Sequence, residues 1–260
     1  MLISIVTPVR NGSRTIERTL RSLQVQKGEF EHVVMDGGST DGTDAIVEGF
    51  RGSYPVRWFS QADRSMYEAV LNGIRHCRGD ILGYINADDF YTPWTLATVR
   101  SVFEMRPDVD WIVGLPSWYN EGSGVGLTTT FAPVYPRGLI RRGWFCPDWL
   151  GCIQQEAVFW RRSVWDKSEA QDLLLKYRYA ADFHLWRRFA ERHTLFTVGS
   201  VFACYSLSND QLSFRFRDKY MEECGRVGRP FRTRVWGKLV NRILSILLPS
   251  LVIKPQALLR

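Results

Sequence analysis

The first hundred residues alternate between short β-rich runs and stretches of helical periodicity, and this alternation constrains the fold more than any other feature. The β-rich runs are LISIVTP, EHVVMD, VRWFSQAD and DILGYINADD. After the first run, Ile16, Leu20 and Leu23 recur at helical spacing, and a second helical stripe runs from Met66 to Cys77. Regular alternation of strands and helices is typical of a parallel sheet with helices on both faces. We therefore expect an α/β fold with a doubly wound, mostly parallel, Rossmann-like sheet.

Polar residues stand at the ends of all four β-rich runs. They lie at residues 7–11, 36–41, 63 and 86–89. In doubly wound sheets, ligands bind outside the carboxyl ends of the strands. We therefore expect the four polar clusters to meet at one edge of the sheet and to form a binding site there.

Two adjacent carboxylates, Asp88 and Asp89, close the fourth run. Mg²⁺ and Mn²⁺ are typically held by one or two carboxylates together with substrate phosphates, so the pair suits a divalent cation. The alternative is a helix cap, in which an aspartate or Thr92 accepts a hydrogen bond from the first turn of the next helix. The three other polar strand ends favour the metal site.

The composition is that of an ordinary globular protein. The chain has 260 residues, of which 45% are hydrophobic and 23% charged. Its five cysteines form no C-x-x-C pair, which argues against a zinc ribbon or a disulfide framework and for reduced thiols in a cytoplasm. No stretch reaches the roughly 20 apolar residues of a membrane-spanning helix, and the first residues do not resemble a signal peptide. We expect a cytoplasmic protein.

The positive charge is concentrated at the C-terminal end. Residues 213–260 carry eleven Lys and Arg against three Asp and Glu, whereas residues 1–212 carry twenty-three against twenty-four. The tail also has an apolar stripe at helical spacing, formed by Leu239, Val240, Ile243, Leu244 and Leu247. A basic amphipathic helix of this kind can lie on the inner face of the cytoplasmic membrane, pack on its own domain, or join two subunits. No nucleic-acid-binding module matches, so nucleic acid is not an expected partner.

The N-terminal part resembles family 2 of the glycosyltransferases, whose fold is called GT-A. The resemblance is carried by SIVTPVRNGSRTIERTLRSLQVQ, EHVVMDGGSTDGT, SQADRSMYEAVLNGIRHCRGDILGYINADDFY and YAADFHLWRRF. It is strongest with members that build bacterial polysaccharides and O-antigens. It implies a GT-A domain over residues 1–212, with a nucleotide-binding half at about 1–105 and an acceptor half at about 106–212. Residues 213–260 would form a basic, partly amphipathic helical extension.

The resemblance also implies a nucleotide-sugar site at the strand ends. Its expected members are Thr7, Pro8, Arg10, Asn11, Asp36, Asp63, Asn86, Ala87, Asp88 and Asp89. Asn86, Ala87 and Asp88 occupy the D-x-D position of the family, which makes Asp88 the expected ligand of Mn²⁺ or Mg²⁺. Because the first position is Asn, a ribose hydrogen bond suits Asn86 better than metal ligation. Arg10 stands where many members place an aromatic residue that stacks on the base, and a guanidinium can stack there too.

Asp182, in YAADFHLW, matches the catalytic base of the family. Such a base takes the proton of the acceptor hydroxyl as that hydroxyl attacks the anomeric carbon. The alternative is a carboxylate that stabilises the start of its helix through the helix dipole. Trp149, Gln154 and Gln155 are expected to line the acceptor sugar, with Gln154 at a position where many members have His. Core packing is the alternative for the tryptophan.

The expected function is that of an inverting, metal-dependent glycosyltransferase of bacterial surface polysaccharide synthesis. The expected donor is a nucleoside-diphosphate sugar, UDP-linked, and the expected acceptor is a glycan or a lipid-linked glycan. One alternative is a nucleotidyltransferase that makes the activated sugar, although TPVRNGS is a poor match to the Gly-rich basic loop that it needs after the first strand. The other is a non-catalytic scaffold subunit of a glycan assembly complex.

Overall fold

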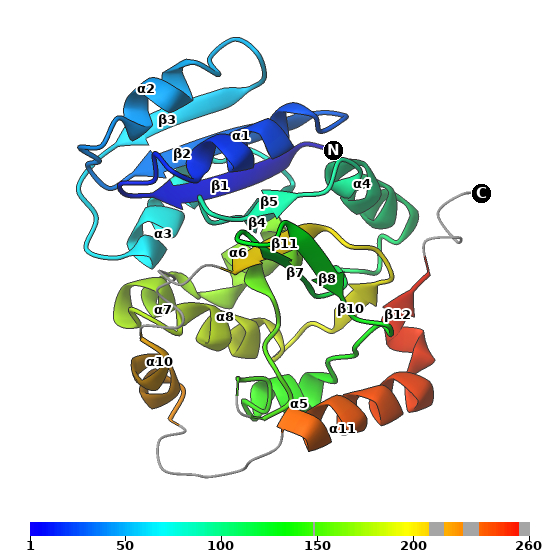
Figure 1. Cartoon of the computed structure of the whole chain (residues 1–260). Helices are drawn as coiled ribbons and strands as arrows, with labels where there is room; N and C mark the ends of the chain where they lie inside the picture. Colours follow the sequence, from blue (N-terminus) through cyan, green and yellow to red (C-terminus); the bar gives the residue numbers. More distant parts are fainter. Residues whose placement is uncertain (148, 208–215, 226–233, 255–260) are drawn as a thin grey trace.

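The computed structural model describes residues 1–147, 149–207, 216–225 and 234–254. Within these ranges the chain forms an eight-stranded sheet and a smaller four-stranded sheet, with helices packed around both (Figure 1). The first strand of the chain is an interior strand of the larger sheet, with later strands on both sides of it.

The larger sheet is almost entirely parallel. From one edge to the other its strands are β12 (Val252–Ile253), β10 (Leu195–Val198), β6 (Trp111–Val113), β9 (Val158–Arg161), β4 (Ile81–Tyr84), β1 (Ile3–Val9), β2 (Phe30–Asp36) and β3 (Val56–Ser60). Only β9 runs antiparallel to its neighbours, β4 and β6. All seven residues of β1 are buried, as expected for a strand covered on both faces. The doubly wound, mostly parallel sheet expected from the sequence is confirmed.

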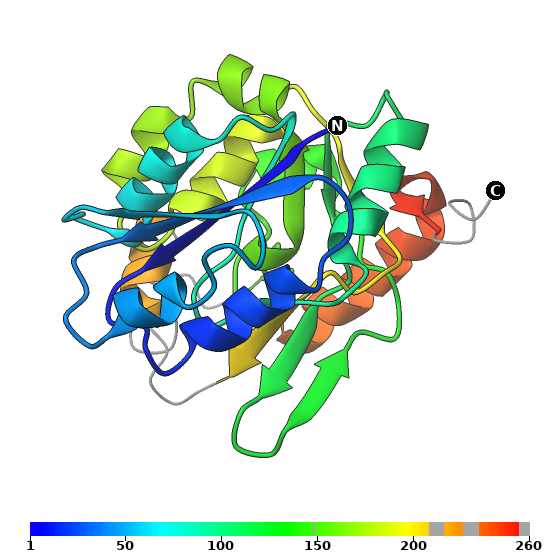
Figure 2. The same cartoon turned by 90° about the horizontal axis from the view of Figure 1, so that it is seen from above.

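Helices cover both faces of this sheet. They are α1 (Ile16–Gln24), α2 (Thr43–Glu48), α3 (Met66–His76), α4 (Thr95–Met105), α5 (Arg137–Arg141), α6 (Arg162–Ser168), α7 (Gln171–Lys176), α8 (Ala181–Phe189), α10 (Arg217–Glu223) and α11 (Arg234–Leu247), with the short 3₁₀ helices η1 (Gln155–Ala157) and η2 (Pro249–Leu251). Figure 2 shows α1 and α2 on one side of β1 and β2, and α3 and α8 on the other. This arrangement puts a hydrophobic layer on each side of the sheet.

The packing of α3 shows how closely the helices approach the strands. Its cap is Ser65, whose side chain accepts a hydrogen bond from the backbone N–H of Glu68. Halfway along the helix, a Cβ atom at Gly73 would collide with the side chain of Val6 in β1. Glycine therefore allows α3 to lie directly on the sheet, and this contact fixes the start of the helix near the strand ends.

The smaller sheet has the order β5 (Phe90–Tyr91), β11 (Ala203–Leu207), β7 (Ser117–Asn120) and β8 (Val125–Thr128). β5 begins directly after Asp89, so this sheet grows out of the carboxyl end of β4. β7 and β8 form an antiparallel hairpin, and β11 pairs parallel with β7. The smaller sheet therefore stands beside the strand ends where the binding site is expected.

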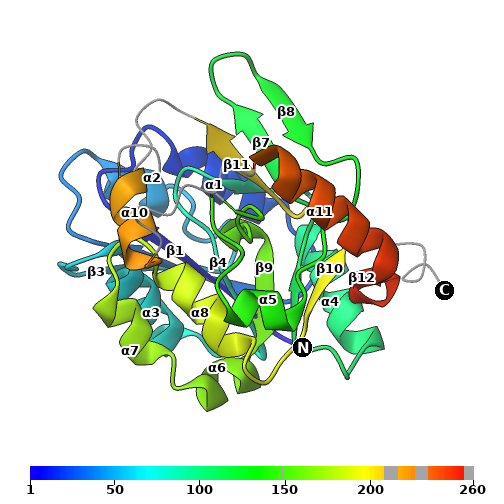
Figure 3. The same ribbon diagram turned by 90° about the horizontal axis from the view of Figure 1, so that it is seen from below.

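The C-terminal segment packs against the main sheet. β12 pairs with β10, and the Asn241 side chain in α11 accepts a hydrogen bond from the backbone N–H of Val134 at 2.9 Å. Of the apolar stripe expected from the sequence, Leu239, Val240, Ile243 and Leu247 are between 38 and 68% exposed, whereas Leu244 is half-buried. Together with Ile246, which is 71% exposed, the four exposed residues form the outward apolar stripe of α11. Figure 3 shows α11 and α5 on the same side of the molecule. None of the helices in the described ranges is long and apolar enough to cross a membrane.

Candidate active site

The four polar clusters lie next to one another at one edge of the main sheet. The register aligns Val9 with Asp36 and Asp36 with Ser60, so β1, β2 and β3 end at the same level. On the other side of β1, the backbone N–H of Ile85 donates to the carbonyl of Val6 at 2.9 Å. The structure thus brings the predicted segments together, and the position of each side chain can be examined in turn.

Asp36 organises the loop that follows β2. Its carboxylate accepts hydrogen bonds from the backbone N–H of Ser39 at 3.0 Å, from the Ser39 hydroxyl at 2.5 Å and from the Ser60 hydroxyl at 2.7 Å. The side chain is only 3% exposed. In this conformation its hydrogen bonds therefore go to the protein, and they hold the ends of β2 and β3 together.

The segment after β1 presents two exposed residues, Arg10 and Asn11. Asn11 has a left-handed backbone with φ of 53°, and its side-chain oxygen accepts a hydrogen bond from the backbone N–H of Thr40 at 2.9 Å. Arg10 lies over Gly37, where an added Cβ atom would be 3.5 Å from the arginine side chain. Both exposed residues therefore contact the loop that follows β2.

Thr7 and Pro8 occupy interior positions in β1. The Thr7 hydroxyl lies 2.9 Å from Nε2 of His32, whose Nδ1 is 3.0 Å from the Tyr54 hydroxyl. Burial lowers the pKa of His32 to about 3, so this imidazole stays neutral. The Thr7 side chain thus belongs to a buried network beneath the strand end.

Asp63 has a carboxylate oxygen that points into the protein without a partner in the described ranges. Its Oδ1 accepts a hydrogen bond from the Asn72 amide at 3.1 Å, whereas its Oδ2 is buried and accepts none. Burial raises the pKa of Asp63, and the charges of Glu68 and Asp36 raise it further. Asp63 therefore keeps an acceptor available at the end of β3.

The turn after β4 holds Asn86, Ala87 and Asp88, all partly exposed. The Asn86 amide donates to Oε1 of Gln155 at 3.2 Å, and its own Oδ1 is buried without a hydrogen bond from the described residues. Arg18 of α1 donates to the carbonyl oxygen of Asp88 at 2.6 Å. The turn is thus held by the Asn86 side chain and by the carbonyl oxygen of Asp88.

Asp89 differs from its neighbour because it is fully buried. Its Oδ1 accepts a hydrogen bond from the backbone N–H of Ser206 in β11 at 2.9 Å, and its carbonyl oxygen accepts one from the Thr19 hydroxyl at 2.6 Å. Burial raises the pKa of Asp89 well above its ordinary value, with Glu156 and Asp88 adding to the effect. The side chain has no exposed surface for a ribose contact, and it joins the two sheets.

Glu156, in η1, is an acidic residue of this region that the sequence analysis missed. Its side chain is 3% exposed, and its Oε1 has no hydrogen-bond partner among the described residues. Burial raises its pKa to about 8, and the charges of Asp88 and Asp182 contribute. The available signal was a glutamate directly before the apolar run AVFW, where a charged side chain is costly to bury.

Asp182 lies in the first turn of α8. The Tyr67 hydroxyl, from α3, donates a hydrogen bond to its Oδ1 at 2.9 Å. Burial raises the pKa of Asp182 to about 6, while hydrogen bonds from the Phe183 backbone and from Tyr67 oppose the rise. The side chain is partly exposed. Asp182 is therefore a positioned carboxylate that can exchange a proton near neutral pH.

The two glutamines expected to line the acceptor are engaged within the protein. Gln154 accepts a hydrogen bond from the backbone N–H of Ser117 at 2.8 Å and donates to the Ser117 carbonyl at 3.2 Å. Gln155 donates to the carbonyl of Tyr84 at 2.8 Å. Trp149 packs edge-on against Trp144, with ring centroids 4.9 Å apart. In this conformation the Gln154 amide binds β7 of the smaller sheet and the Gln155 amide binds β4 of the larger sheet, so both hold the segment before β9 in place.

The donor set at the strand ends fits a cation that is shared with a ligand. Within the described ranges, no three His, Cys, Asp or Glu side chains come together around a common point that could enclose a metal ion. Asp88 offers one carboxylate on a partly exposed side chain at the end of β4. Mg²⁺ and Mn²⁺ are commonly held by one or two carboxylates, with the remaining ligands supplied by phosphates and water.

Comparison with known proteins gives a family match over most of the chain. The family model of glycosyl transferase family 2 matches residues 4–166. Chondroitin synthase from Escherichia coli is 35% identical over 94 residues, which are 35% of this chain and 14% of that protein. A PGL/p-HBAD biosynthesis glycosyltransferase of Mycobacterium bovis is 32% identical over 117 residues, which are 44% of this chain and 46% of that protein. The chain therefore spans less than half the length of these curated relatives.

Solved structures with the same fold show lower sequence identity. S. aureus TarS residues 1–349 superpose with a TM-score of 0.64 and 16% identity, covering 86% of this chain and 64% of that one. The mannosyltransferase PcManGT from Pyrobaculum calidifontis superposes with a TM-score of 0.60 and 18% identity, covering 99% of this chain and 77% of that one. At these identities the likeness establishes the fold, which agrees with the expected GT-A architecture.

Proposed function

Because the chain belongs to glycosyltransferase family 2, we propose that it transfers a sugar from a nucleoside-diphosphate sugar to a hydroxyl group of a glycan or lipid-linked glycan, with inversion at the anomeric carbon. The observation that carries this proposal is Asp182. Its carboxylate is held by Tyr67 at the start of α8, and its pKa of about 6 leaves it mostly ionised at neutral pH. A base with these properties suits the removal of a proton from an attacking hydroxyl.

In the proposed reaction, Asp182 accepts the proton of the acceptor hydroxyl while the hydroxyl oxygen attacks the anomeric carbon. The bond between that carbon and the diphosphate oxygen breaks on the opposite face, so the configuration inverts. Asp88 would hold Mn²⁺ or Mg²⁺, which supplies positive charge for the leaving diphosphate when bound. The Tyr67 hydroxyl keeps the Asp182 carboxylate oriented during the proton transfer.

We further propose that the nucleotide of the donor sugar is UDP. S. aureus TarS has been solved with UDP and with UDP-GlcNAc, and PcManGT with GDP-Man and Mn²⁺. The strand ends here offer partly exposed polar side chains for a base and a ribose, namely those of Asp63, Asn86 and Asp88. A thermal-shift comparison of UDP and GDP sugars, each with Mn²⁺, tests the choice of base, and stabilisation by GDP sugars alone would contradict it.

We also propose that the enzyme acts in bacterial surface polysaccharide synthesis, at the inner face of the cytoplasmic membrane. The relatives named above include a chondroitin synthase and a PGL/p-HBAD biosynthesis glycosyltransferase. The outward apolar stripe of α11 belongs to a segment with eleven basic and three acidic residues. An amphipathic helix in a segment with an excess of basic residues can bind an anionic lipid surface.

The catalytic proposal is tested with Asp182→Asn. We expect transfer to fall by about 10²–10⁴-fold, since this is the usual contribution of a general base, while donor binding stays unchanged. Asp172→Asn is the matched control, because Asp172 is an exposed carboxylate in the first turn of the neighbouring helix α7. Wild-type turnover in Asp182→Asn would overturn the assignment of the base.

The same preparation separates the two alternative functions. A nucleotidyltransferase would release pyrophosphate from a sugar 1-phosphate and a nucleoside triphosphate, and we expect none. A scaffold subunit would show neither reaction, and it would give identical results for wild type and Asp182→Asn.

A further inference from the structure

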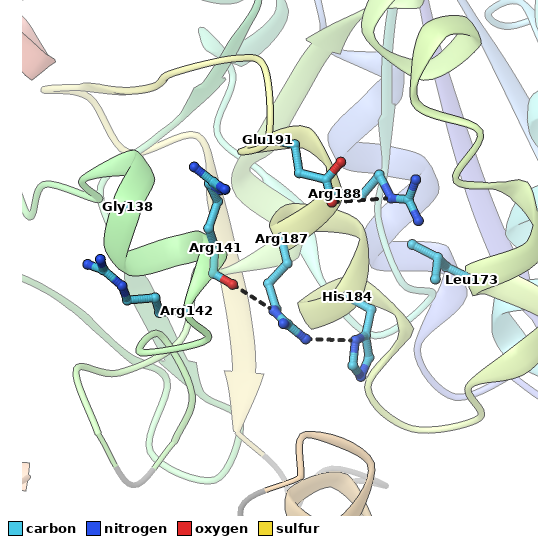
Figure 4. A pocket seen from close by; sticks show the side chains of 8 residues that line it. All are labelled: Gly138, Arg141, Arg142, Leu173, His184, Arg187, Arg188 and Glu191. Carbon is cyan, nitrogen blue, oxygen red and sulfur yellow. Dashed lines mark hydrogen bonds and ion pairs between the residues drawn. The ribbon is translucent and has the colours of Figure 1, made fainter.

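A pocket of about 600 Å³ lies between α5 and α8, away from the strand ends (Figure 4). Its charged and titratable lining consists of Arg141, Arg142, Arg187, Arg188, His184 and Glu191. The lining thus includes four arginines and one carboxylate, that of Glu191, and Figure 4 shows the Arg187 side chain directed towards His184. A volume of this size is typical of small-molecule sites in proteins.

Three arginines of the pocket, Arg141, Arg187 and Arg188, have little charge compensation from the described residues. The Arg141 guanidinium has no hydrogen bond or ion pair with any described residue, and the residue is exposed. Arg187 interacts with neutral groups, since its Nε donates to the carbonyl of Arg141 at 3.1 Å. Arg188 approaches Glu191 only at 3.7 Å, between partly exposed side chains. Pairs of that kind contribute little, so they leave the charge available to a ligand.

His184 orients Arg187 without adding charge. Its Nε2 lies 2.9 Å from the carbonyl oxygen of Glu223, which can only accept, so Nε2 carries the proton. Nδ1 is then the acceptor for the Arg187 guanidinium at 3.4 Å. Burial lowers the pKa of His184, and the charge of Arg187 lowers it further. The neutral ring, stacked on Tyr177 at 3.7 Å, is a fixed support for the guanidinium.

The pocket and the proposed base share one helix. Asp182 and His184 are both in the first turn of α8, and Arg187 and Arg188 follow one turn later. Asp182 lies on the stripe that continues through the buried Leu185 and Trp186, whereas the pocket residues lie on the outward stripe. The pocket nevertheless reaches His184, which is two residues from Asp182, so a ligand anchored there lies near the end of α8 that carries the base.

We propose that this pocket binds the diphosphate group of a lipid-linked acceptor. Guanidinium forks bind phosphate oxygens in pairs, and a diphosphate supplies negative charge that matches Arg141, Arg187 and Arg188. The outward apolar stripe of α11 lies on the same side of the molecule as α5, which favours a lipid as the source of the group (Figures 1 and 3). This inference rests on the proposed function, because it names the acceptor of the same reaction.

The binding step is tested by calorimetry with inorganic pyrophosphate in EDTA, so that no metal-dependent donor site contributes. We expect one pyrophosphate per chain, unaffected by saturating UDP. In the double variant Arg141→Gln, Arg187→Gln the dissociation constant should rise at least about tenfold, because two charge-assisted contacts are lost. Arg137→Gln is the matched control, since Arg137 is an exposed arginine of α5 outside the pocket. Displacement by UDP, or equal affinity in the double variant, would overturn the proposal.

The lipid source is tested with phosphatidylcholine vesicles that contain farnesyl diphosphate, compared with phosphatidylcholine alone. Wild type should sediment with the doped vesicles, and the double variant should do so at least about tenfold less. Binding of free pyrophosphate without binding of doped vesicles would overturn the lipid assignment. Asp182→Asn should bind pyrophosphate as wild type does, so failure of the pocket and failure of the proposed base give different results.

Discussion

At the scale of single residues, the pKa of Asp182 is set by opposing influences. Burial raises it to about 6, and hydrogen bonds from the Phe183 backbone and the Tyr67 hydroxyl hold it down. A base must be ionised, so kcat/KM should fall tenfold per pH unit below about 6 and level off above it. Tyr67→Phe removes a donor that favours the ionised form, and the fall should therefore begin at higher pH.

The measurement is a pair of pH–rate profiles at constant metal concentration. Tyr177→Phe is the control, because Tyr177 stacks on His184 and does not contact Asp182 in the described structure. If the acidic side of the pH–rate profile is unchanged in Tyr67→Phe, or is shifted to lower pH, the role assigned to the tyrosine is wrong.

The raised pKa of Glu156 leads to a prediction about the free energy of unfolding. Its pKa rises from 4.5 to about 8 on folding, so the folded state binds a proton more tightly than the unfolded chain. The contribution of Glu156 to the free energy of unfolding is therefore most favourable at low pH. It is lost progressively as the pH rises from about 4.5 to about 8. Glu156→Gln should raise the free energy of unfolding at pH 8 by more than about 1.4 kcal/mol, the equivalent of one pKa unit.

Urea denaturation of metal-free protein at pH 5 and pH 8 measures this effect. At pH 5 the difference between Glu156→Gln and wild type should be much smaller, because the glutamate is then protonated. Glu104→Gln, at an exposed site in α4, should match wild type at both values. A variant at Glu156 that is less stable than wild type at pH 8 would show that the ionised carboxylate is stabilising.

At the scale of elements, α10 holds the start of α8. The Glu223 carboxylate accepts hydrogen bonds from three successive backbone N–H groups, those of Arg178, Tyr179 and Ala180, at 2.8 to 3.0 Å. Asp182 follows two residues later, so its position depends on this anchor. We expect Glu223→Ala to lower kcat about tenfold with little change in the KM for the donor. It should also cost about 1 kcal/mol of stability, because two partly buried N–H donors lose their acceptor.

The neighbouring residue provides the control for this prediction. Glu222 is exposed on the same helix, and Glu222→Ala should leave kcat and the melting temperature unchanged. A Glu223→Ala protein that melts earlier but keeps full kcat at low temperature would show that the anchor is structural only.

The elements near the site were predictable because local patterns determine them. The four β-rich runs form β1 to β4, and the stripe from Met66 onwards forms α3. Partners across the chain were not predictable in the same way. Gln154 is held by Ser117, and the start of α8 is capped by Glu223, and neither contact leaves a periodic signal. The division of the chain at residue 212 stays a prediction, although β12 joins the main sheet.

At the scale of the whole molecule, α11 shows why an apolar stripe alone does not predict the buried face of a helix. Its inward positions include Gly237, where an added Cβ atom would collide with the carbonyl oxygen of Trp149. They also include Asn241, which is 4% exposed and bonded to Val134. Close approach of backbones and a polar contact hold the helix in place, and the apolar residues are left outside.

This arrangement makes the membrane proposal testable without disturbing the core. We expect wild type to sediment with vesicles of phosphatidylcholine and anionic phosphatidylglycerol, and binding should weaken as salt rises because part of the attraction is electrostatic. Replacing three exposed residues of the stripe by serine, Ile243, Ile246 and Leu247, should reduce binding at least about tenfold, since each loses roughly 1 kcal/mol or more of apolar burial. Folding should be unaffected, because these side chains are between 47 and 71% exposed.

Val125 and Leu127 provide the matched control, because they are exposed apolar residues of β8, at 50 and 60%, outside the basic segment. The double variant Val125→Ser, Leu127→Ser should bind vesicles as wild type does. If the two sets of variants lose binding equally, the attraction is a general effect of exposed apolar surface and α11 has no special role. If wild type is a dimer that the α11 variant disperses, without any binding to vesicles, then the stripe joins two copies of the chain and the membrane proposal is wrong.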